Sequence, residues 1–377
     1  MTASAETFKG SPALAGGPAP HAERIEAAAP VGAEVPAVPA LAGGVELLGE
    51  VSGSGYRRAP ALVRRSDGQT VQLTPLLYHL LTVIDGERDY EELAQSFGER
   101  TGRLATAEDI RFLAEAKLRP LGLLRRPDGT EPVVKKANPL LALRLKLVAS
   151  NPAVTNRIAG LFAPLFRLPV VLAVTAGFAL ATWWVAFKTG LASAAHQALY
   201  QPEMLLLVFA LTLLSAAFHE VGHAAACRFS GARPGAMGMG LYLVWPAFYT
   251  DVTDAYRLER KGRLRVDLGG LYFNAIFGIA MLGVWKLVGW DALLLVVAAQ
   301  PIQMLRQLVP IVRFDGYHIL ADLTGVPDLF HHIKPTLLGL IPKRGRPRNP
   351  LKAWVRATVT LWVLIVVPVL AAFFLFL

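Results

Sequence analysis

Five consecutive residues, His219-Glu220-Val221-Gly222-His223, carry the residue types that a zinc hydrolase needs. Side chains four positions apart lie on one face of an α-helix, so His219 and His223 can offer two imidazoles to one metal ion. Glu220 falls beside them, where its carboxylate can take a proton from a water that the metal polarises. The pattern therefore predicts a Zn²⁺ site with Glu220 as general base. Two surface histidines beside an exposed glutamate are the alternative interpretation.

The stretch around this motif is apolar and long enough to cross a bilayer. Residues 204–227 exceed the ~20 apolar residues that a transmembrane helix requires. One ionisable group near the centre of such a helix costs roughly 2.5–3.5 kcal/mol on insertion scales. A lipid-embedded helix has no aqueous surface, which disfavours the surface interpretation of the histidines. The motif and its setting together favour hydrolysis inside a membrane.

The composition is typical of a multi-span membrane protein. Of the 377 residues, 54% are hydrophobic and 18% are charged, and the mean hydropathy is +0.43. The single cysteine, Cys227, excludes an internal disulfide and a cysteine-rich zinc cluster. We interpret it as a small buried thiol, with a third-ligand role as the alternative. Much of the net charge of +10 lies beside apolar segments, where it sets orientation in the membrane.

Apolar segments predict the fold class, a polytopic α-helical membrane protein with about five transmembrane helices. The expected spans are residues 168–187, 204–227, 268–285, 292–312 and 357–377. Lys and Arg are frequent in 228–265 and 313–356 and absent from 189–203. By the positive-inside rule, this alternation places the N-terminus in the cytoplasm and the histidines near the cytoplasmic end of their span.

A catalytic zinc usually has three protein ligands, so the motif is one ligand short. Asp315 follows the fourth expected span, at a depth similar to that of the histidines. Gly316 allows an unusual backbone turn that would aim this carboxylate inward. Asp315 is therefore the candidate third ligand, and a helix cap in the next segment is the alternative. His318 either forms a hydrogen bond that orients Asp315 or is an interface residue. His331 and His332 are expected to lie on the surface.

Two distant motifs carry a family resemblance. The zinc-binding motif and the later stretch Gln307-Leu-Val-Pro-Ile-Val-Arg-Phe-Asp315-Gly316 resemble the site-2 protease family of intramembrane zinc proteases. Residues 242–256 and 308–317 are similar to its bacterial branch of peptide zinc metalloproteases. The resemblance covers about residues 168–335. The chain departs from the family at Gln307, where Asn is usual, and at Leu271, where Pro is frequent. These departures concern substrate positioning and leave the metal ligands in place.

The resemblance implies a zinc endopeptidase that cleaves a membrane-associated peptide or protein. It implies His219, His223 and Asp315 as zinc ligands, Glu220 as general base, and Asn274 as a group that positions substrate or an oxyanion. A packing amide between helices is the alternative role of Asn274. The implied location is the bacterial cytoplasmic (inner) membrane.

The chain before the first span divides by composition. Residues 1–44, rich in Ala, Pro and Gly, predict a disordered tail, and residues 128–167 form a basic connector suited to the membrane surface. Residues 45–127 predict a small cytoplasmic α+β domain, and residues 168–377 form the transmembrane zinc protease domain. In the small domain we expect short strands in 45–65, helices over 74–84, 90–101 and 106–121, and a closing strand at 122–124.

The small domain resembles a PqqD-like, winged-helix peptide-recognition domain. The residues that carry this resemblance are Leu73-Thr-Pro-Leu-Leu-Tyr-His-Leu-Leu-Thr-Val-Ile-Asp85-Gly86. The resemblance implies capture of a peptide by strand addition. A DNA-binding winged helix is the alternative, since the domain has a small basic cluster, Arg57, Arg58, Arg64 and Arg65. No recognition helix is clearly basic, so we expect no nucleic-acid partner. A purely regulatory cap remains a competing role.

Residues 236–256 read as a strand or hairpin against the bilayer, to which an extended substrate could add by main-chain pairing. A structural plug is the alternative. Asp251 and Asp254 are expected to cap turns, with metal binding as the alternative.

Three functions remain open at this point. The first is an intramembrane zinc endopeptidase. The second is a catalytically silent zinc-binding membrane component that works with a peptide maturation, export or secretion partner. The third is a regulator that cleaves a membrane-anchored signalling protein, which shares the chemistry of the first and differs in substrate.

Overall fold

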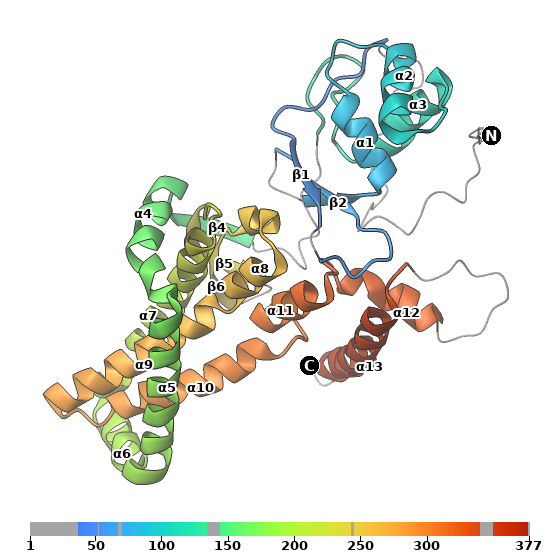
Figure 1. The fold of residues 1–377 in the computed structure, drawn as a ribbon. Helices are drawn as coiled ribbons and strands as arrows, with labels where there is room; N and C mark the ends of the chain where they lie inside the picture. Colours follow the sequence, from blue (N-terminus) through green and yellow to red (C-terminus); the bar gives the residue numbers. More distant parts are fainter. Residues whose placement is uncertain are drawn as a thin grey trace. The chain divides into compact units, whose positions relative to one another are not determined.

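The computed structural model describes residues 37–51, 53–66, 70–133, 144–242, 245–339 and 350–375. The chain forms two compact units (Figure 1). The first unit combines the chain up to residue 137 with residues 324–368, and the second unit contains residues 138–323 and the C-terminal residues. Residues 1–36 of the predicted tail lie outside the described residues.

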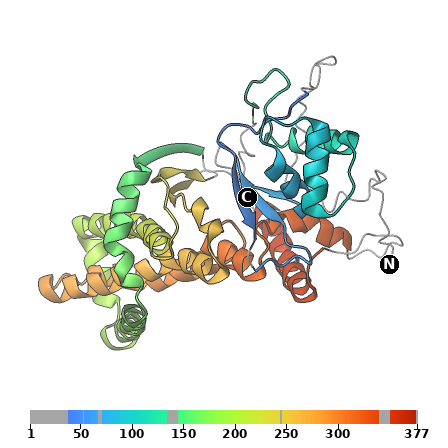
Figure 2. The ribbon, with the colours of Figure 1, turned by 45° about the horizontal axis from the view of Figure 1, so that its top comes forward.

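The first unit contains a three-stranded antiparallel sheet in the order β1-β2-β3. Its strands are β1 (Glu46–Glu50), β2 (Ala61–Arg64) and β3 (Thr70–Leu73). The helices α1 (Pro75–Val83), α2 (Tyr90–Thr101) and α3 (Ala107–Leu113) lie together on one side of this sheet (Figures 1 and 2). Apolar side chains of β2, β3 and all three helices form one buried core.

Each helix of this domain begins at a capping residue, close to the start that the sequence predicts. Thr74 accepts from the Leu77 N–H, and Asp89 and Thr106 form capping boxes with acidic residues three positions on. The third helix continues as a π-helical turn, η2 (Ala114–Leu118), and ends three residues earlier than expected. The strand expected at 122–124 does not form, since Leu124 makes only an isolated bridge with Leu41.

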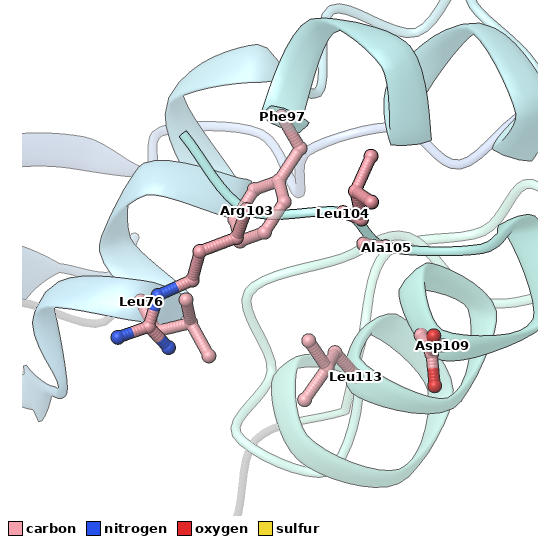
Figure 3. A pocket seen from close by; sticks show the side chains of 7 residues that line it. All are labelled: Leu76, Phe97, Arg103, Leu104, Ala105, Asp109 and Leu113. Atoms are coloured by element: carbon pink, nitrogen blue, oxygen red, sulfur yellow. The ribbon is translucent and has the colours of Figure 1, made fainter. Parts of the chain in front are cut away.

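A small apolar pocket opens between the helices of this domain (Figure 3). It is lined by Leu76, Phe97, Arg103, Leu104, Ala105, Asp109 and Leu113. Its volume of about 10 Å³ holds roughly one water. The pocket is therefore too small to hold an organic ligand without a rearrangement of these side chains.

Structural contacts occupy three of the four arginines in the predicted basic cluster. Arg65 is buried and donates to the Leu121 carbonyl at 2.9 Å, and Arg64 pairs with Glu46 at 3.7 Å. Arg57 donates to the Leu351 carbonyl at 3.4 Å. These three arginines thus have contacts within the protein.

The loop between β1 and β2 is held by the C-terminal part of the same unit, in an arrangement that we call the clasp. Gly55 donates its N–H to the Gly325 carbonyl at 3.0 Å and accepts from the Lys352 N–H at 2.9 Å. The Tyr56 hydroxyl lies 2.9 Å from His332 Nε2. His332 is buried, so the prediction that it lies on the surface is wrong.

The C-terminal part of the first unit is helical. It contains η6 (Phe330–His332), α12 (Ile333–Gly339) and α13 (Ala353–Leu375). Helix α13 is long and apolar enough to cross a membrane, as the sequence predicts for the last span.

The second unit is mostly helical, and three of its helices are long and apolar enough to span a membrane. These are α5 with its π-helical extension η4 (together Leu168–Thr189), α7 (Pro202–Phe229) and α9 (Gly269–Val288). With α13, the described residues contain four candidate spans. The remaining elements are α4 (Pro152–Phe162), η3 (Ala163–Phe166), α6 (Ala192–Tyr200), η5 (Thr253–Arg257), α8 (Arg260–Asp267), α10 (Leu293–Leu308) and α11 (Asp315–Thr324).

The span predicted at 292–312 is shorter than expected. Helix α10 has 16 residues, a length of roughly 24 Å at 1.5 Å per residue. It therefore falls short of the ~30 Å hydrocarbon core. The chain leaves the helix after Leu308, just before Pro310, because a proline interferes with helix continuation at the residues before it. Pro301, by contrast, is accommodated inside the helix.

Helices α7 and α9 meet at two glycines. A Cβ atom built on Gly222 would strike the Gly269 carbonyl, and one built on Gly269 would strike the Gly222 carbonyl. Small residues allow such close backbone approach between helices in membranes. Gly222 therefore admits a neighbouring backbone, which belongs to Gly269.

A second three-stranded sheet lies beside these helices, in the order β4-β5-β6. Strands β5 (Met237–Tyr242) and β6 (Trp245–Thr250) form the expected antiparallel hairpin. Strand β4 (Arg144–Ser150) comes from the connector and pairs with β5. Strand β4 has no local signal in the sequence, because its partner lies about ninety residues away.

We expect acid to weaken the clasp. Burial and the neighbouring His331 lower the pKa of His332 to about 4, whereas an unfolded histidine has a pKa of about 6.5. The unfolded chain therefore binds the proton more tightly, and the stability contributed by neutral His332 is lost as the pH falls from about 6.5 toward 4. Melting of the full chain in detergent at about pH 7.5 and pH 5 measures this loss.

The control is His332→Gln, which keeps polar atoms near Tyr56 and cannot titrate in this range. The melting temperature of the wild type should fall further between about pH 7.5 and pH 5 than that of the variant. An equal loss in both proteins would show that another group titrates.

Candidate metal centre

Helix α7 presents both imidazoles of the predicted motif in one buried place. His219 and His223 have exposed fractions of 3% and 9%. Their Nε2 atoms lie 3.0 Å apart, as expected for residues one helical turn apart. Both ligand atoms are therefore directed at a common point.

Asp315, at the start of α11, completes the cluster. Its carboxylate oxygens lie 3.1 Å from His219 Nε2 and 3.4 Å from His223 Nε2. Gly316 lets α11 begin against the end of α10, since any Cβ there would strike the Leu308 backbone. The expected unusual turn at Gly316 is wrong, because its φ is not positive and close backbone approach is the reason for the glycine.

The cluster fits a single zinc ion. His219, His223 and Asp315 each offer one ligand atom, and these atoms all lie within 4.8 Å of one another. Two ligands at ~2.0–2.1 Å from a tetrahedral zinc are roughly 3.3 Å apart, close to the observed separations. A Cβ atom on Gly270 of α9 would lie against the Nε2 atoms of both histidines, so this glycine keeps the space beside the ligand atoms open.

The second ring nitrogen of His223, which does not face Asp315, is hydrogen-bonded to the backbone of α8. His223 Nδ1 lies 2.7 Å from the Val266 carbonyl. This contact fixes the tautomer, because Nδ1 donates and Nε2 remains free to bind a metal. His219 Nδ1 is buried and has no hydrogen-bond partner among the described residues. The sequence carried no signal for Val266, since a backbone carbonyl is independent of residue type.

Glu220 is half-buried and adjacent to His219 on α7. Its carbonyl accepts a hydrogen bond from the Thr250 hydroxyl at 3.0 Å. Thr250 is the last residue of β6. The end of the hairpin is thus fixed at the residue that the sequence predicts to be the general base.

Asn274 lies one helical turn beyond Gly270 on α9. It is 1% exposed, and neither its amide nitrogen nor its oxygen has a hydrogen-bond partner among the described residues. Gln307 Oε1 on α10 is also buried and unpaired among them. Buried polar groups are nearly always paired, so an unpaired amide calls for an explanation.

Ser215 and Gln300 form a polar contact between distant parts of the chain, which the sequence did not predict. Both are fully buried, and the Ser215 hydroxyl donates to Gln300 Oε1 at 2.9 Å. The Gln300 amide also donates to the Val296 carbonyl at 3.1 Å. Ser215 lies one turn before His219, so this contact holds α10 against the helix that carries the histidines.

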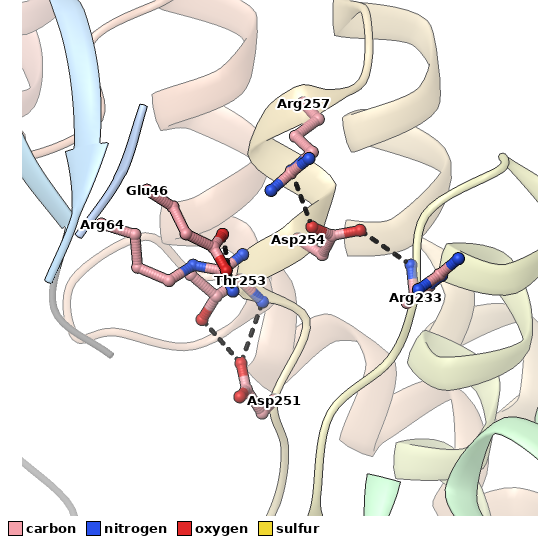
Figure 4. Close-up of polar contacts among 7 residues, drawn as sticks. All are labelled: Glu46, Arg64, Arg233, Asp251, Thr253, Asp254 and Arg257. Carbon is pink, nitrogen blue, oxygen red and sulfur yellow. Dashed lines mark hydrogen bonds and ion pairs between the residues drawn. The ribbon is translucent and has the colours of Figure 1, made fainter. Parts of the chain in front are cut away.

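Three other candidate residues lie outside the cluster. Cys227 is buried among apolar side chains that include Phe166 and Phe273. Asp251 accepts from the Thr253 N–H and hydroxyl, and Asp254 accepts from the Arg233 N–H and pairs with Arg257 at 2.9 Å (Figure 4). The predicted turn-capping role is confirmed for Asp251, whereas Asp254 joins Arg257 to the backbone of Arg233, 21 residues earlier in the chain.

His318 is exposed on α11 and stacks edge-on with Tyr317. Among the described residues it makes no side-chain hydrogen bond to Asp315. Its position fits the interface alternative better than a role in supporting the third ligand.

A second group of ionisable side chains lies between α8 and α11. Arg263 is 2% exposed, and its Nε lies 2.7 Å from Asp322 Oδ1. Burial and the neighbouring Asp322 carboxylate raise the pKa of Asp267 above the usual range of an aspartate.

The site has the donor set of a zinc hydrolase, and comparison with known proteins points to the same class. The chain is 27% identical, over 135 residues, to "Putative peptide zinc metalloprotease protein YydH" of Bacillus subtilis (strain 168). The matched part is 34% of this chain and 52% of the relative, so the chain spans about half the length of that relative. No protein-family profile and no solved structure matches the chain. The similarity supports a zinc metalloprotease.

We expect Gly270→Ala to abolish zinc binding while the helix survives, because the added methyl would occupy space beside the ligand atoms. Gly283→Ala on the same helix is the matched control, since a Cβ there meets no atom within 4 Å. Metal analysis of the purified proteins should find about one zinc per chain in the wild type and the control. Stoichiometric zinc in Gly270→Ala would contradict the placement of the ion.

Proposed function

We propose that this chain is an intramembrane zinc-dependent endopeptidase of the site-2 protease type. The supporting observation is the convergence of His219, His223 and Asp315 from two separate helices, beside Glu220. Both histidines lie on α7, a helix of membrane-spanning length and composition. The similarity to a protein named as a zinc metalloprotease supports the hydrolytic part of the proposal.

The chain's own residues supply binding and proton transfer. His219, His223 and Asp315 would hold Zn²⁺, which polarises a water and a substrate carbonyl when bound. The Glu220 carboxylate accepts a proton from the attacking water and delivers it to the departing amine nitrogen. The amide of Asn274 offers an unpaired donor and acceptor to the substrate backbone or to a developing oxyanion.

The β6 strand is proposed as the substrate-positioning edge. In the sheet order β4-β5-β6, one side of β6 has no strand partner among the described residues. Thr250 fixes the end of this strand to Glu220. An extended peptide that pairs with β6 would be led toward the general base. A structural plug is the alternative role of the hairpin.

The biological setting follows from the same proposal. The protein would be a multi-pass protein of the bacterial cytoplasmic membrane with its N-terminus in the cytoplasm. Its partners would be the lipid bilayer, a peptide or transmembrane protein substrate, and a peptide export or secretion component. The N-terminal domain, with three strands followed by three helices, would act as a PqqD-like module that captures the peptide.

Gln307 gives the catalytically silent alternative a specific basis, since the site-2 protease resemblance leads us to expect Asn at this position. Glu220→Gln separates the two functions. It keeps size and polarity but cannot accept the proton, so we expect zinc content to be unchanged and cleavage to fall by at least about 100-fold. The measurement is accumulation of uncut peptide in cells that carry the variant. Unchanged function in this variant would favour the silent component.

A second prediction concerns Asn274. Leucine has the same number and branching of side-chain heavy atoms and needs no hydrogen bond, so Asn274→Leu should leave the melting temperature unchanged or raise it. Cleavage should fall while zinc content is retained, because the lost amide serves the substrate. A large loss of stability would instead show that Asn274 is a packing amide between helices.

A further inference from the structure

The third zinc ligand depends on the placement of a short helix. His219 and His223 share the 28-residue α7, whereas Asp315 begins the 10-residue α11. A carboxylate must be held within about 0.5 Å of its productive position to serve a metal site. Some contact must therefore align α11 with α7.

Asp315 and Asp322 lie on one face of α11, because seven residues make about two helical turns. The Asp315 carboxylate contacts the two histidines. The Asp322 carboxylate contacts Arg263 Nε at 2.7 Å. One face of this helix is thus held at both ends by charged groups.

The Arg263 guanidinium is itself fixed. It is almost fully buried, and its Nη1 donates to the Leu258 carbonyl at 2.8 Å. The carbonyl of Leu258, just before α8, therefore orients the planar group toward Asp322. A lysine would carry the charge but could not make both contacts with this fork geometry.

Helix α8 touches both ligand-bearing helices. Arg263 and Val266 are three residues apart, so they lie on one face of α8. Val266 accepts from His223 Nδ1 at 2.7 Å, and Arg263 pairs with Asp322 of α11. This one short helix therefore fixes the orientation of one histidine and the position of the helix that carries Asp315.

We propose that Arg263 and Asp322 are positioning residues of the metal centre, which hold Asp315 in register with His219 and His223 through α8. The inference rests on the zinc site of the proposed function and adds to it two residues that touch no metal. Replacement of outer partners of this kind weakens metal binding by about 10–100-fold. A pair that serves only general stability would leave the affinity for zinc unchanged in folded protein.

The test measures metal binding by the full chain in detergent, without reference to cleavage. Asp322→Asn and Arg263→Lys are compared with the wild type by chelator competition for Zn²⁺ and by the visible absorption of bound Co²⁺. We expect zinc affinity to fall about 10–100-fold in both variants, with altered Co²⁺ bands. Asp322→Glu should restore part of the affinity, because it keeps the carboxylate.

Glu115→Gln is the matched control. Glu115 pairs with Arg119 in the N-terminal domain, where the side chains are 21% and 14% exposed, and neither residue contacts a zinc ligand. This variant should bind zinc as the wild type does and give the same Co²⁺ spectrum.

Folded variants with wild-type affinity and an unchanged Co²⁺ spectrum would overturn the inference and leave the proposed function intact. Loss of the folded state in both Asp322→Asn and Arg263→Lys would also overturn it, since the pair would then hold the fold as a whole. A wild-type chain that binds no zinc would refute the proposed function, and this inference with it.

Discussion

The contact between Gly222 and Gly269 determines the geometry of the candidate metal centre. Lipid gives helices little hydrophobic reason to associate, so close packing of small residues has to hold them together. Gly222 immediately precedes His223, and Gly269 immediately precedes Gly270. The crossing therefore brings the imidazoles against a residue with no side chain. The ligand atoms remain uncovered by α9, and Asp315 approaches them from α11.

Polar groups near this crossing fall into two classes that differ in hydrogen bonding. Ser215, Gln300 and His223 Nδ1 are buried and paired with protein atoms. Asn274 and Gln307 Oε1 are buried and unpaired among the described residues. Unpaired polar atoms in an apolar interior destabilise the folded protein, so they are retained mainly where they serve a function. The paired groups hold the helices and His223 in place. We infer that the unpaired amides form hydrogen bonds with the backbone of a bound substrate.

Local signals in the sequence were sufficient for the helix starts, for four of the five expected apolar spans and for the two histidines on one helix face. Thr74, Asp89 and Thr106 cap helices through contacts within three residues, and hydropathy is likewise a local property. Contacts between distant segments were not predictable in this way. The pairing of β4 with β5, the clasp at His332 and the Arg263–Asp322 ion pair each join separate parts of the chain. Asp315 could be proposed despite its distance from the histidines because a catalytic zinc usually needs a third protein ligand, and the structure brings it beside them.

Under the proposed function, a hairpin beside Glu220 would address a problem that hydrolysis inside a membrane poses. A peptide bond inside a helix is shielded, since its N–H and C=O are already hydrogen-bonded along the segment. Cleavage requires that segment to become extended, and lipid offers no replacement hydrogen bonds. A free strand edge supplies them. Because β4 already pairs with β5, the edge left for a peptide is that of β6, the strand whose last residue is bonded to Glu220. Unwinding and proton transfer would then take place at neighbouring positions.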